Sequence, residues 1–460
     1  MDRAAPARDV TGSAAVAALV TVTAGLLQGD TSISRDSETV NWMRSTKIAL
    51  AFVGLLVGAG FATGQEVIQY FVSFGTIGLL GVVIAGVVMA LAGAVIIQLG
   101  SFYLAKEHNM VFRSVANPVI SKFLDVAVTL TLFCIGFVML AGAGSTLEQQ
   151  FGLPAWIGAL IMTVIVMLVG LLDVDKVSSV ISMLTPLVIV AVLVAFIYTM
   201  FTLPSDFSAL SPTAQQAESP VQPWLLSALN YNGLSLILGV SMCLVIGGNN
   251  PEPREAGMGG LMGGLIYTVL LIMAAVALFF NIEAVGQASV PMLELFASIH
   301  PVLATIMVFV IFAMIFNTAI GMLYALGRRL TASRQNRYRP VFLATCVVGY
   351  AVSFVGFDTL MTYVYPVIGY IGMIMVIVMA VGWLRSRSEI SEETTRRARL
   401  RALLRLRRAP DKQFAQGHEQ RIDRAAEESP ARGEELTEAI DSEVREDLGE
   451  QGTETAENAR

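Results

Sequence analysis

The stretch VGLLVGAGFATGQEVIQYF, residues 53–71, combines the apolar composition of a membrane helix with closely spaced glycines and a glutamate. A membrane helix satisfies its backbone groups internally, and glycine is the residue that most easily interrupts such a helix. Counted from Lys47 at about 1.5 Å per residue, Gly58 lies about 16 Å along the helix, near the middle of a bilayer core of about 30 Å. The stretch therefore predicts a helix that opens at Gly58, Ala59 and Gly60 at mid-membrane depth.

The composition of the whole chain is that of a membrane protein. Hydrophobic residues make up 55% of its 460 residues and charged residues 14%. Cys134, Cys243 and Cys346 stand singly in apolar runs, without the spacing of a metal site or a disulfide framework. The net charge of −6 owes much to acidic residues after Arg424, and no phosphate-binding loop or catalytic triad pattern occurs. The sequence therefore indicates neither nucleic-acid binding nor an enzyme.

Ten apolar segments are long enough to cross a bilayer core. They are 47–74, 76–104, 123–149, 154–172, 177–203, 224–250, 257–282, 300–327, 341–357 and 359–384. The connections that follow the odd-numbered segments contain no Lys or Arg. Those that follow the even-numbered segments contain Lys106, Arg113, Lys122, Lys176, Arg254, Arg328, Arg329, Arg334, Arg337 and Arg339. Because basic residues mark cytoplasmic connections, the pattern predicts a multi-pass plasma-membrane protein with both termini in the cytoplasm.

The segments also repeat along the chain. Each of segments six to ten begins about 180 residues after its counterpart among segments one to five. Five is an odd number, so the second set of five must cross the membrane in the opposite sense. The predicted fold class is an all-α integral membrane protein of ten transmembrane helices in a 5+5 inverted repeat, with repeats 47–203 and 224–384. Spans of similar length would also give similar intervals, and this simpler explanation stays open.

Both ends of the chain lie outside the predicted membrane domain, 47–384. Residues 1–46 are interpreted as an N-terminal extension that is disordered or precedes a true start at Met43. Residues 385–460 are predicted to be a cytoplasmic charged tail, largely disordered. Within this tail, the basic segment 396–408 is a candidate for contact with anionic lipids, although a solvated tail without such a role explains it equally well. The sequence does not indicate an oligomeric state.

Two stretches carry candidate substrate-binding residues. In the first, backbone N–H groups freed at a break would hold an anionic group such as a carboxylate, whereas the alternative is that the glycines only permit close helix packing. In the second, NYNG at 230–233 lies near mid-membrane in the sixth segment and predicts a second broken helix. The competing position for that break is Gly239 to Ser241. The candidate residues are Gly58, Ala59, Gly60, Thr63, Asn230, Tyr231, Asn232 and Gly233.

Glu66, with its neighbour Gln65, is a candidate coupling or gating residue. Measured along a straight helix from Lys47, Glu66 lies about 28 Å in, toward the outer face and beyond the glycine pocket. An ionisable residue within a span is a functional candidate by default. Three roles stay open: a proton carrier, a partner for a cationic group of the substrate, and a cap on an outer gate.

Asn317 and Thr318 are adjacent polar residues in the eighth segment. Oxygen ligands at such a place, together with carbonyls of an unwound helix, can hold Na⁺. A Thr in a membrane helix more commonly bonds to a carbonyl of its own helix.

The nonapeptide GAGFATGQE, 58–66, with its flanking spans, resembles the amino acid–polyamine–organocation transporter superfamily and its LeuT-type fold. The chain resembles most the YkvI-type group of bacterial membrane proteins over 47–384. The resemblance implies that helices one and six are broken at the substrate. It also implies a sodium site near Gly54, Val57, Asn317 and Thr318.

The expected function is secondary active transport of a small organic solute, an amino acid or amine, by alternating access. Na⁺ or H⁺ is the expected coupling ion, and no other cofactor is expected. A channel and a non-transporting sensor on a transporter fold are the alternatives. A channel would have a continuous polar lining, whereas the polar residues here gather near two mid-membrane positions.

Overall fold

The computed structural model describes residues 41–171, 184–204, 207, 209–408 and 414–448. Within these ranges every regular element is a helix, which confirms the all-α class. Residues 1–40, most of the predicted N-terminal extension, lie outside the described residues. The first described helix begins at Trp42, slightly before the predicted start of the membrane domain at Lys47.

Seven helices are long and apolar enough to cross a membrane. They are α5 (Thr76–Phe102), α7 (Pro118–Phe151), α10 (Leu184–Phe201), α12 (Trp224–Gly248), α13 (Pro253–Phe280), α16 (Pro301–Leu330) and α18 (Phe357–Arg385). Two shorter helices are α8 (Ala155–Gly170) and α17 (Tyr338–Ser353), and the first predicted span is divided into α2 (Trp42–Leu56), α3 (Ala59–Thr63) and α4 (Gln65–Tyr70). Each of the ten predicted segments thus contains helix, and the count of ten spans stays a prediction.

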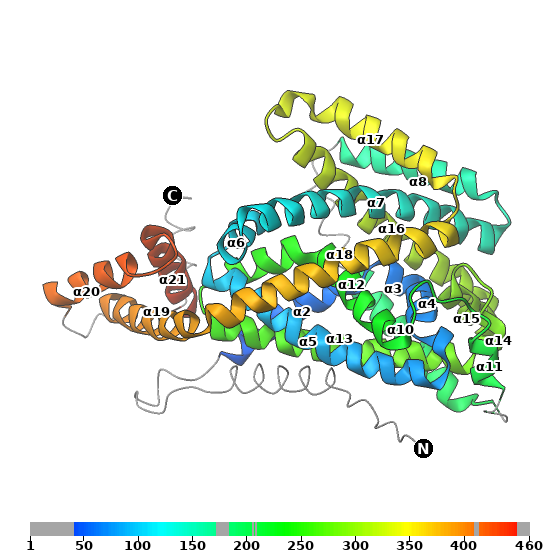
Figure 1. Cartoon of the computed structure of the whole chain (residues 1–460), viewed down its shortest axis with the longest axis horizontal. Helices are drawn as coiled ribbons and strands as arrows, with labels where there is room; N and C mark the ends of the chain where they lie inside the picture. Colours follow the sequence, from blue (N-terminus) through cyan, green and yellow to red (C-terminus); the bar gives the residue numbers. More distant parts are fainter. Residues whose placement is uncertain (1–40, 172–183, 205–206, 208, 409–413, 449–460) are drawn as a thin grey trace, which may run out of the picture.

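Short elements connect these helices. They are η1 (Val72–Phe74), α6 (His108–Val115), α11 (Leu210–Ala214), α14 (Ile282–Val285), α15 (Pro291–Ile299) and η2 (Gln335–Arg337). Figure 1 shows α6 at one end of the bundle, and α11, α14 and α15 at the other.

Helices of the two predicted repeats pack against one another reciprocally. α2, from the first repeat, packs on α13, and α12, from the second repeat, packs on α5. Exchanging the repeats turns one of these contacts into the other. The same exchange relates the packing of α7 on α17 to that of α8 on α16, and α7 and α16 also pack on each other. A two-fold relationship between the repeats would produce such reciprocity.

Small residues permit the most extensive helix packing, which is between α5 and α13. A Cβ added at Gly260 would lie 2.6 Å from the Gly93 carbonyl oxygen, and one added at Gly264 would lie 2.3 Å from the Ala90 Cα. Membrane helices associate through such close backbone approach because no hydrophobic effect drives them together within lipid.

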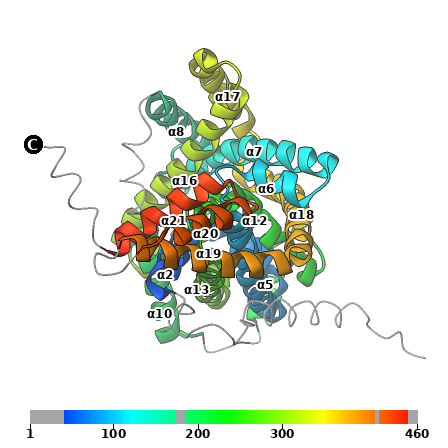
Figure 2. The same ribbon diagram turned by 90° about the vertical axis from the view of Figure 1, so that its left-hand side faces the viewer.

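Three helices follow α18 and form a C-terminal unit: α19 (Arg387–Arg408), α20 (Gln416–Glu427) and α21 (Gly433–Asp447). The unit lies over one end of the bundle, at the ends of α2, α12 and α13 (Figures 1 and 2). The prediction that 385–460 is largely disordered is therefore wrong for these three helices. That prediction relied on the high charge of the segment and overlooked apolar residues that recur at helical spacing. The buried apolar residues, which pack with Leu104 of the membrane region, are Leu400, Leu404, Ile422, Leu436, Ile440 and Val444.

Most arginines in 396–408 pair with carboxylates instead of facing open solvent. The paired residues are Arg396, Arg397, Arg401, Arg405, Arg407 and Arg408, and their partners are Glu393, Glu428, Glu252, Glu443, Asp447, Glu419 and Asp441. The predicted contact of this segment with anionic lipids does not match this arrangement, because carboxylates of the protein already neutralise these side chains.

Candidate functional site

The first predicted span is interrupted twice. α2 ends at Leu56, and the Gly58 N–H donates to the Leu56 carbonyl at 2.9 Å instead of to the Gly54 carbonyl, as it would in a regular helix. Gly64 then ends α3 with a φ of 80°, a left-handed conformation that glycine adopts without strain. The predicted opening at 58–60 is therefore displaced: the first break is at Val57 and Gly58, and Ala59 and Gly60 belong to α3.

The second break brings Glu66 back to the glycines. A Cβ added at Gly60 would lie 1.5 Å from Glu66 Oε1 and 2.3 Å from its Cδ. Glu66 is only 7% exposed. The interpretation that Glu66 stands outside the glycine pocket is therefore wrong, because the rise of a straight helix does not apply across Gly58 and Gly64.

Four tyrosines surround this carboxyl group. Tyr70, Tyr231, Tyr267 and Tyr365 are buried and lie close enough for electrostatic interaction with Glu66. The hydroxyls of Tyr231 and Tyr267 share a hydrogen bond, and the Tyr70 hydroxyl is buried without a partner in the described part of the chain. The rings of Tyr70 and Tyr231 are 5.7 Å apart. We call Glu66 and these four residues the carboxyl–tyrosine cluster.

The other first-span candidates lie around this cluster. The Thr63 hydroxyl donates to the Gly60 carbonyl at 2.8 Å, inside α3. The Gln65 amide donates to Asp358 of α18 at 3.4 Å, and Ser289, before α15, donates to the same carboxylate at 2.5 Å. Asp358 thus links α4 and the segment before α15 to α18, at the end of the bundle remote from the C-terminal unit.

The sixth predicted span is not broken. α12 is one continuous helix through both proposed break positions, so the prediction that helix six is discontinuous is wrong. The physical reason lies in its packing on α18. A Cβ added at Gly233 would lie 2.2 Å from the Gly369 carbonyl oxygen, and the Asn230 amide donates to the Pro366 carbonyl at 3.0 Å. Ser241 bonds to His108 at 2.9 Å. Gly233 therefore allows α12 and α18 to pack closely, and it does not interrupt the helix.

The NYNG residues therefore have different surroundings. Tyr231 enters the carboxyl–tyrosine cluster, and Asn230 and Gly233 face α18. Asn232 is buried, and neither its amide nitrogen nor its amide oxygen has a hydrogen-bond partner in the described structure. A buried, unpaired amide is costly, so Asn232 is a candidate for contact with a ligand or water.

The predicted sodium ligands are only partly brought together. The break releases the Gly54 carbonyl from its helical partner, and Val57 lies at the same break. α16, which carries Asn317 and Thr318, packs against α3. The Thr318 hydroxyl, however, donates to the Met314 carbonyl of its own helix at 3.2 Å. The sodium site stays a prediction.

Tyr70, Tyr267 and Tyr365 were missed as site residues because the sequence does not show that three separate segments bring them to Glu66. Their one signal in the sequence is a hydroxyl group within a predicted span, which needs a partner when it is buried in a membrane.

Comparison with known proteins identifies relatives over most of the chain. No family model matches. The uncharacterized membrane protein YkvI of Bacillus subtilis is 28% identical over 337 residues, which cover 72% of this chain and 93% of YkvI. The uncharacterized protein YyaD of the same organism is 25% identical over 337 residues, which cover 73% of this chain and 96% of YyaD. The resemblance to the YkvI-type group is confirmed, and with seven apolar helices it makes this chain a multi-pass membrane protein.

Similarity to solved structures is weaker. An inward-facing conformation of Mhp1 matches with a TM-score of 0.45 and 13% identity, covering 75% of this chain and 77% of Mhp1. A mutant of the manganese transporter of Eremococcus coleocola matches with a TM-score of 0.48 and 14% identity, covering 92% of this chain and 90% of the transporter. At these scores the similarities carry no weight for the function.

Proposed function

We propose that this relative of YkvI is a secondary active transporter of a small organic solute that carries an ammonium group, an amino acid or an amine. Transport would proceed by alternating access in the plasma membrane, driven by Na⁺ or H⁺. The observation that carries the proposal is the carboxyl–tyrosine cluster, in which a buried glutamate lies beside a break in a membrane helix.

The chemistry of the cluster favours a cationic ligand. No Lys or Arg in the described part of the chain lies close enough to Glu66 to interact with its charge. A buried carboxylate without a partner is unfavourable, so Glu66 must hold a proton or bind a cation. An ammonium group satisfies the carboxylate and interacts favourably with tyrosine faces. Binding of the solute and release of a proton are then linked at one carboxyl group.

The break offers a second polar feature for an amino acid. The N–H groups of Val57 and Gly58 bond to the Val53 and Leu56 carbonyls, so the backbone donors open to a ligand at this break are those in the first turn of α3, which begins at Ala59. An amino acid would place its ammonium group at Glu66 and its carboxylate toward this break. An amine would use the cluster alone.

The helix arrangement supports a 5+5 inverted repeat with both termini in the cytoplasm. The reciprocal packing of α2 on α13 and of α12 on α5 agrees with the repeat interval in the sequence. The basic connections support a cytoplasmic position for the end of the bundle that carries the C-terminal unit. In this orientation Gln65, Ser289 and Asp358 close the outer end.

Proteoliposomes containing the purified protein test the proposal. Amines, amino acids and organic acids would be supplied separately under an imposed Na⁺ or H⁺ gradient, and their uptake measured. We expect gradient-driven uptake of an ammonium-bearing solute, loss of that uptake in Glu66→Gln, and retention in Glu283→Gln, which removes an exposed acid at the outer end. Uptake confined to solutes without an amine, or equal uptake by the two variants, would contradict the proposal.

A further inference from the structure

The inner half of the first span is built as a separate rigid piece. α2 is joined to α3 only through the non-helical Val57 and Gly58. Along its length it packs on α13, where a Cβ added at Gly263 would lie 2.7 Å from the Ala49 carbonyl oxygen. Ser45, buried at this interface, donates to the Glu255 carbonyl at 3.1 Å. A helix that is hinged at one end and packs mainly on one neighbour, with a smaller contact on α12, can swing away as a unit.

The C-terminal unit is anchored firmly to the neighbours of α2. Arg397 is 1% exposed, and its guanidinium donates to the carbonyls of Ser101, Phe102 and Pro251 at 2.9, 2.8 and 3.0 Å. It also pairs with Glu393 at 2.7 Å. Removing a guanidinium with this many buried bonds would take a donor from three carbonyls and would leave Glu393 with only Arg396 and Ser429 as partners. This contact ties α19 to the end of α5 and to the connection between α12 and α13.

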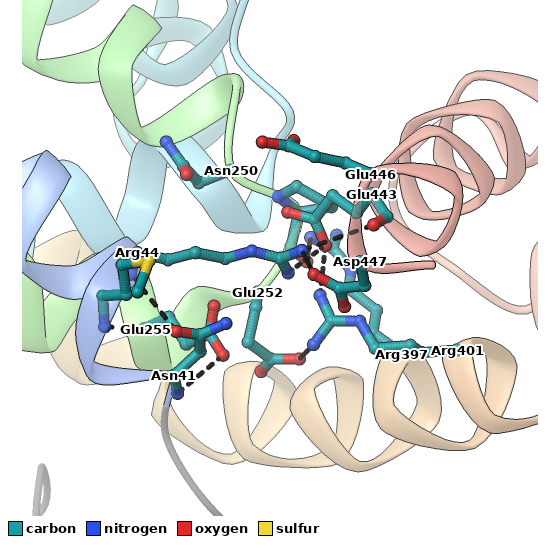
Figure 3. Close-up of polar contacts among 12 residues, drawn as sticks. Asn41, Arg44, Asn250, Glu252, Glu255, Arg397, Arg401, Glu443, Glu446 and Asp447 are labelled. Carbon is teal, nitrogen blue, oxygen red and sulfur yellow. Dashed lines mark hydrogen bonds and ion pairs between the residues drawn. The ribbon is translucent and has the colours of Figure 1, made fainter. Parts of the chain in front are cut away.

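The same unit holds α2 by a lighter contact. Arg44, in the first turn of α2, donates to Glu443 Oε2 at 3.0 Å and to Asp447 Oδ1 at 2.5 Å, both on α21. Figure 3 shows the Arg44 side chain extending from α2 toward these two carboxylates. Arg401 of α19 bonds to the same Glu443 carboxylate. The side chains of Arg44, Glu443 and Asp447 keep 13–24% exposure, so water can replace their partners when the contact opens.

We propose that the C-terminal unit is a latch on the cytoplasmic gate. Arg397 keeps the unit attached to the bundle, while the contact of Arg44 with Glu443 and Asp447 holds α2 closed against α13. Opening of the cytoplasmic side requires α2 to leave α13 and therefore requires this contact to break. The proposal rests on the alternating-access function proposed above, and it makes Arg44 a positioning residue that sets how readily the gate opens.

Cysteine labelling tests the latch without any solute. Ser45→Cys, nearly isosteric with serine, would be introduced into the full chain with Cys134, Cys243 and Cys346 replaced by Ala, and reconstituted in nanodiscs. The labelling rate with a water-soluble maleimide reports how often α2 leaves α13. We expect Arg44→Gln to raise this rate by about tenfold, equivalent to about 1.4 kcal/mol in the opening equilibrium, and Arg44→Lys to restore slow labelling.

Lys106→Gln is the matched control. Lys106 pairs with Glu435 at 3.1 Å, so its removal also breaks an ion pair between the bundle and α21, but one that does not involve α2. We expect it to leave the labelling rate at the parent value. A parent-like rate in Arg44→Gln, or equal acceleration in both variants, would overturn the latch. Because labelling requires no uptake, its result stands apart from the proteoliposome test of transport.

Discussion

The Glu66 carboxylate occupies the space next to Gly60 in which a side chain at position 60 would have to lie. The distance of 1.5 Å from an added Cβ to Glu66 Oε1 is far below any real contact. Two residues six positions apart in the sequence are therefore a matched pair: the glycine leaves room, and the glutamate fills it. Because a regular helix would place residues i and i+6 on different faces, this contact depends on the turn at Gly64.

Gly60→Ala is expected to remove function by displacing Glu66. The methyl group has to push the carboxylate away, at a cost of about 1–3 kcal/mol for an overpacked site. Solute uptake and thermal stability in detergent are the two measurements. We expect uptake to fall much more than thermal stability. The added methyl group displaces only the end of the flexible Glu66 side chain, which can move without disturbing the packing of the helices.

Gly58→Ala is the control for this prediction. A Cβ at Gly58 meets no atom within 4 Å, and its φ of −98° suits any residue. We expect this variant to keep most of its uptake. If Gly58→Ala lowers uptake as much as Gly60→Ala does, then uptake requires flexibility at the break, and the space that Gly60 leaves for Glu66 does not explain the loss.

Tyr267 provides a test of what the tyrosines do. Its hydroxyl bonds to Tyr231 and its ring packs on Phe61 with centroids 5.5 Å apart. Tyr267→Phe keeps the aromatic face, whereas Tyr267→Leu removes it. Cation–π interactions in desolvated sites contribute about 0.5–2 kcal/mol, or about 2- to 30-fold in affinity. We expect solute affinity, measured by calorimetry, to fall more in Tyr267→Leu than in Tyr267→Phe. The opposite order would assign the role to the hydroxyl.

The crossing of α12 and α18 is expected to be intolerant of side chains. A Cβ at Gly372 would lie 2.0 Å from the Gly233 carbonyl oxygen, which is backbone and cannot turn aside. We therefore expect Gly372→Ala to lower the melting temperature or to prevent folding. Gly321→Ala, where a Cβ meets nothing within 4 Å, is the control in α16 and should melt like the parent. Equal melting of the two variants would show that the helices can separate at this crossing.

Hydropathy and charge were sufficient to predict the helical segments, because each depends on composition within a short window. Glycine position was not sufficient to predict broken helices. Gly58, among small and apolar residues, and Gly233, beside polar residues, both lie near the middle of a predicted span, yet the first lies at a break and the second inside α12. What separates them is tertiary packing: Gly233 meets the backbone of α18, whereas a Cβ at Gly58 would meet nothing. The sequence around each glycine does not reveal which helix packs against it.

The position of Glu66 was mispredicted for a related reason. Depth along a span was converted from residue number with the rise of a straight helix, and this conversion fails after a left-handed residue such as Gly64. In the C-terminal region the difficulty was different. Arg397 and Glu393 look like solvated charges in sequence, and their burial is made favourable by distant carbonyls, two of which, Ser101 and Phe102, lie almost 300 positions away.

The docking of the C-terminal unit is expected to weaken as pH rises. Burial raises the pKa of the Glu252 carboxyl from 4.5 to about 7, and the Arg401 guanidinium at 3.6 Å only partly opposes this effect. The other charged groups that face it are Glu255 of α13, Arg397 of α19 and Glu443 of α21. Burial also raises the pKa of Glu443, so both carboxyls act in the same direction.

The docked state therefore holds a proton on Glu252 that the released state loses. Its contribution to docking is complete below about pH 4.5 and is lost as pH rises through about 7, with an upper limit of about 3 kcal/mol from a shift of this size. The Ser45→Cys labelling rate at each pH is divided by the rate for the same protein unfolded in denaturant, because the reactive thiolate itself becomes more abundant as pH rises. This ratio should increase between about pH 5 and 8, and Glu252→Gln should remove most of the increase, because an amide carries no titrating proton. An unchanged pH profile in Glu252→Gln would assign the dependence to another group, such as His108 of α6.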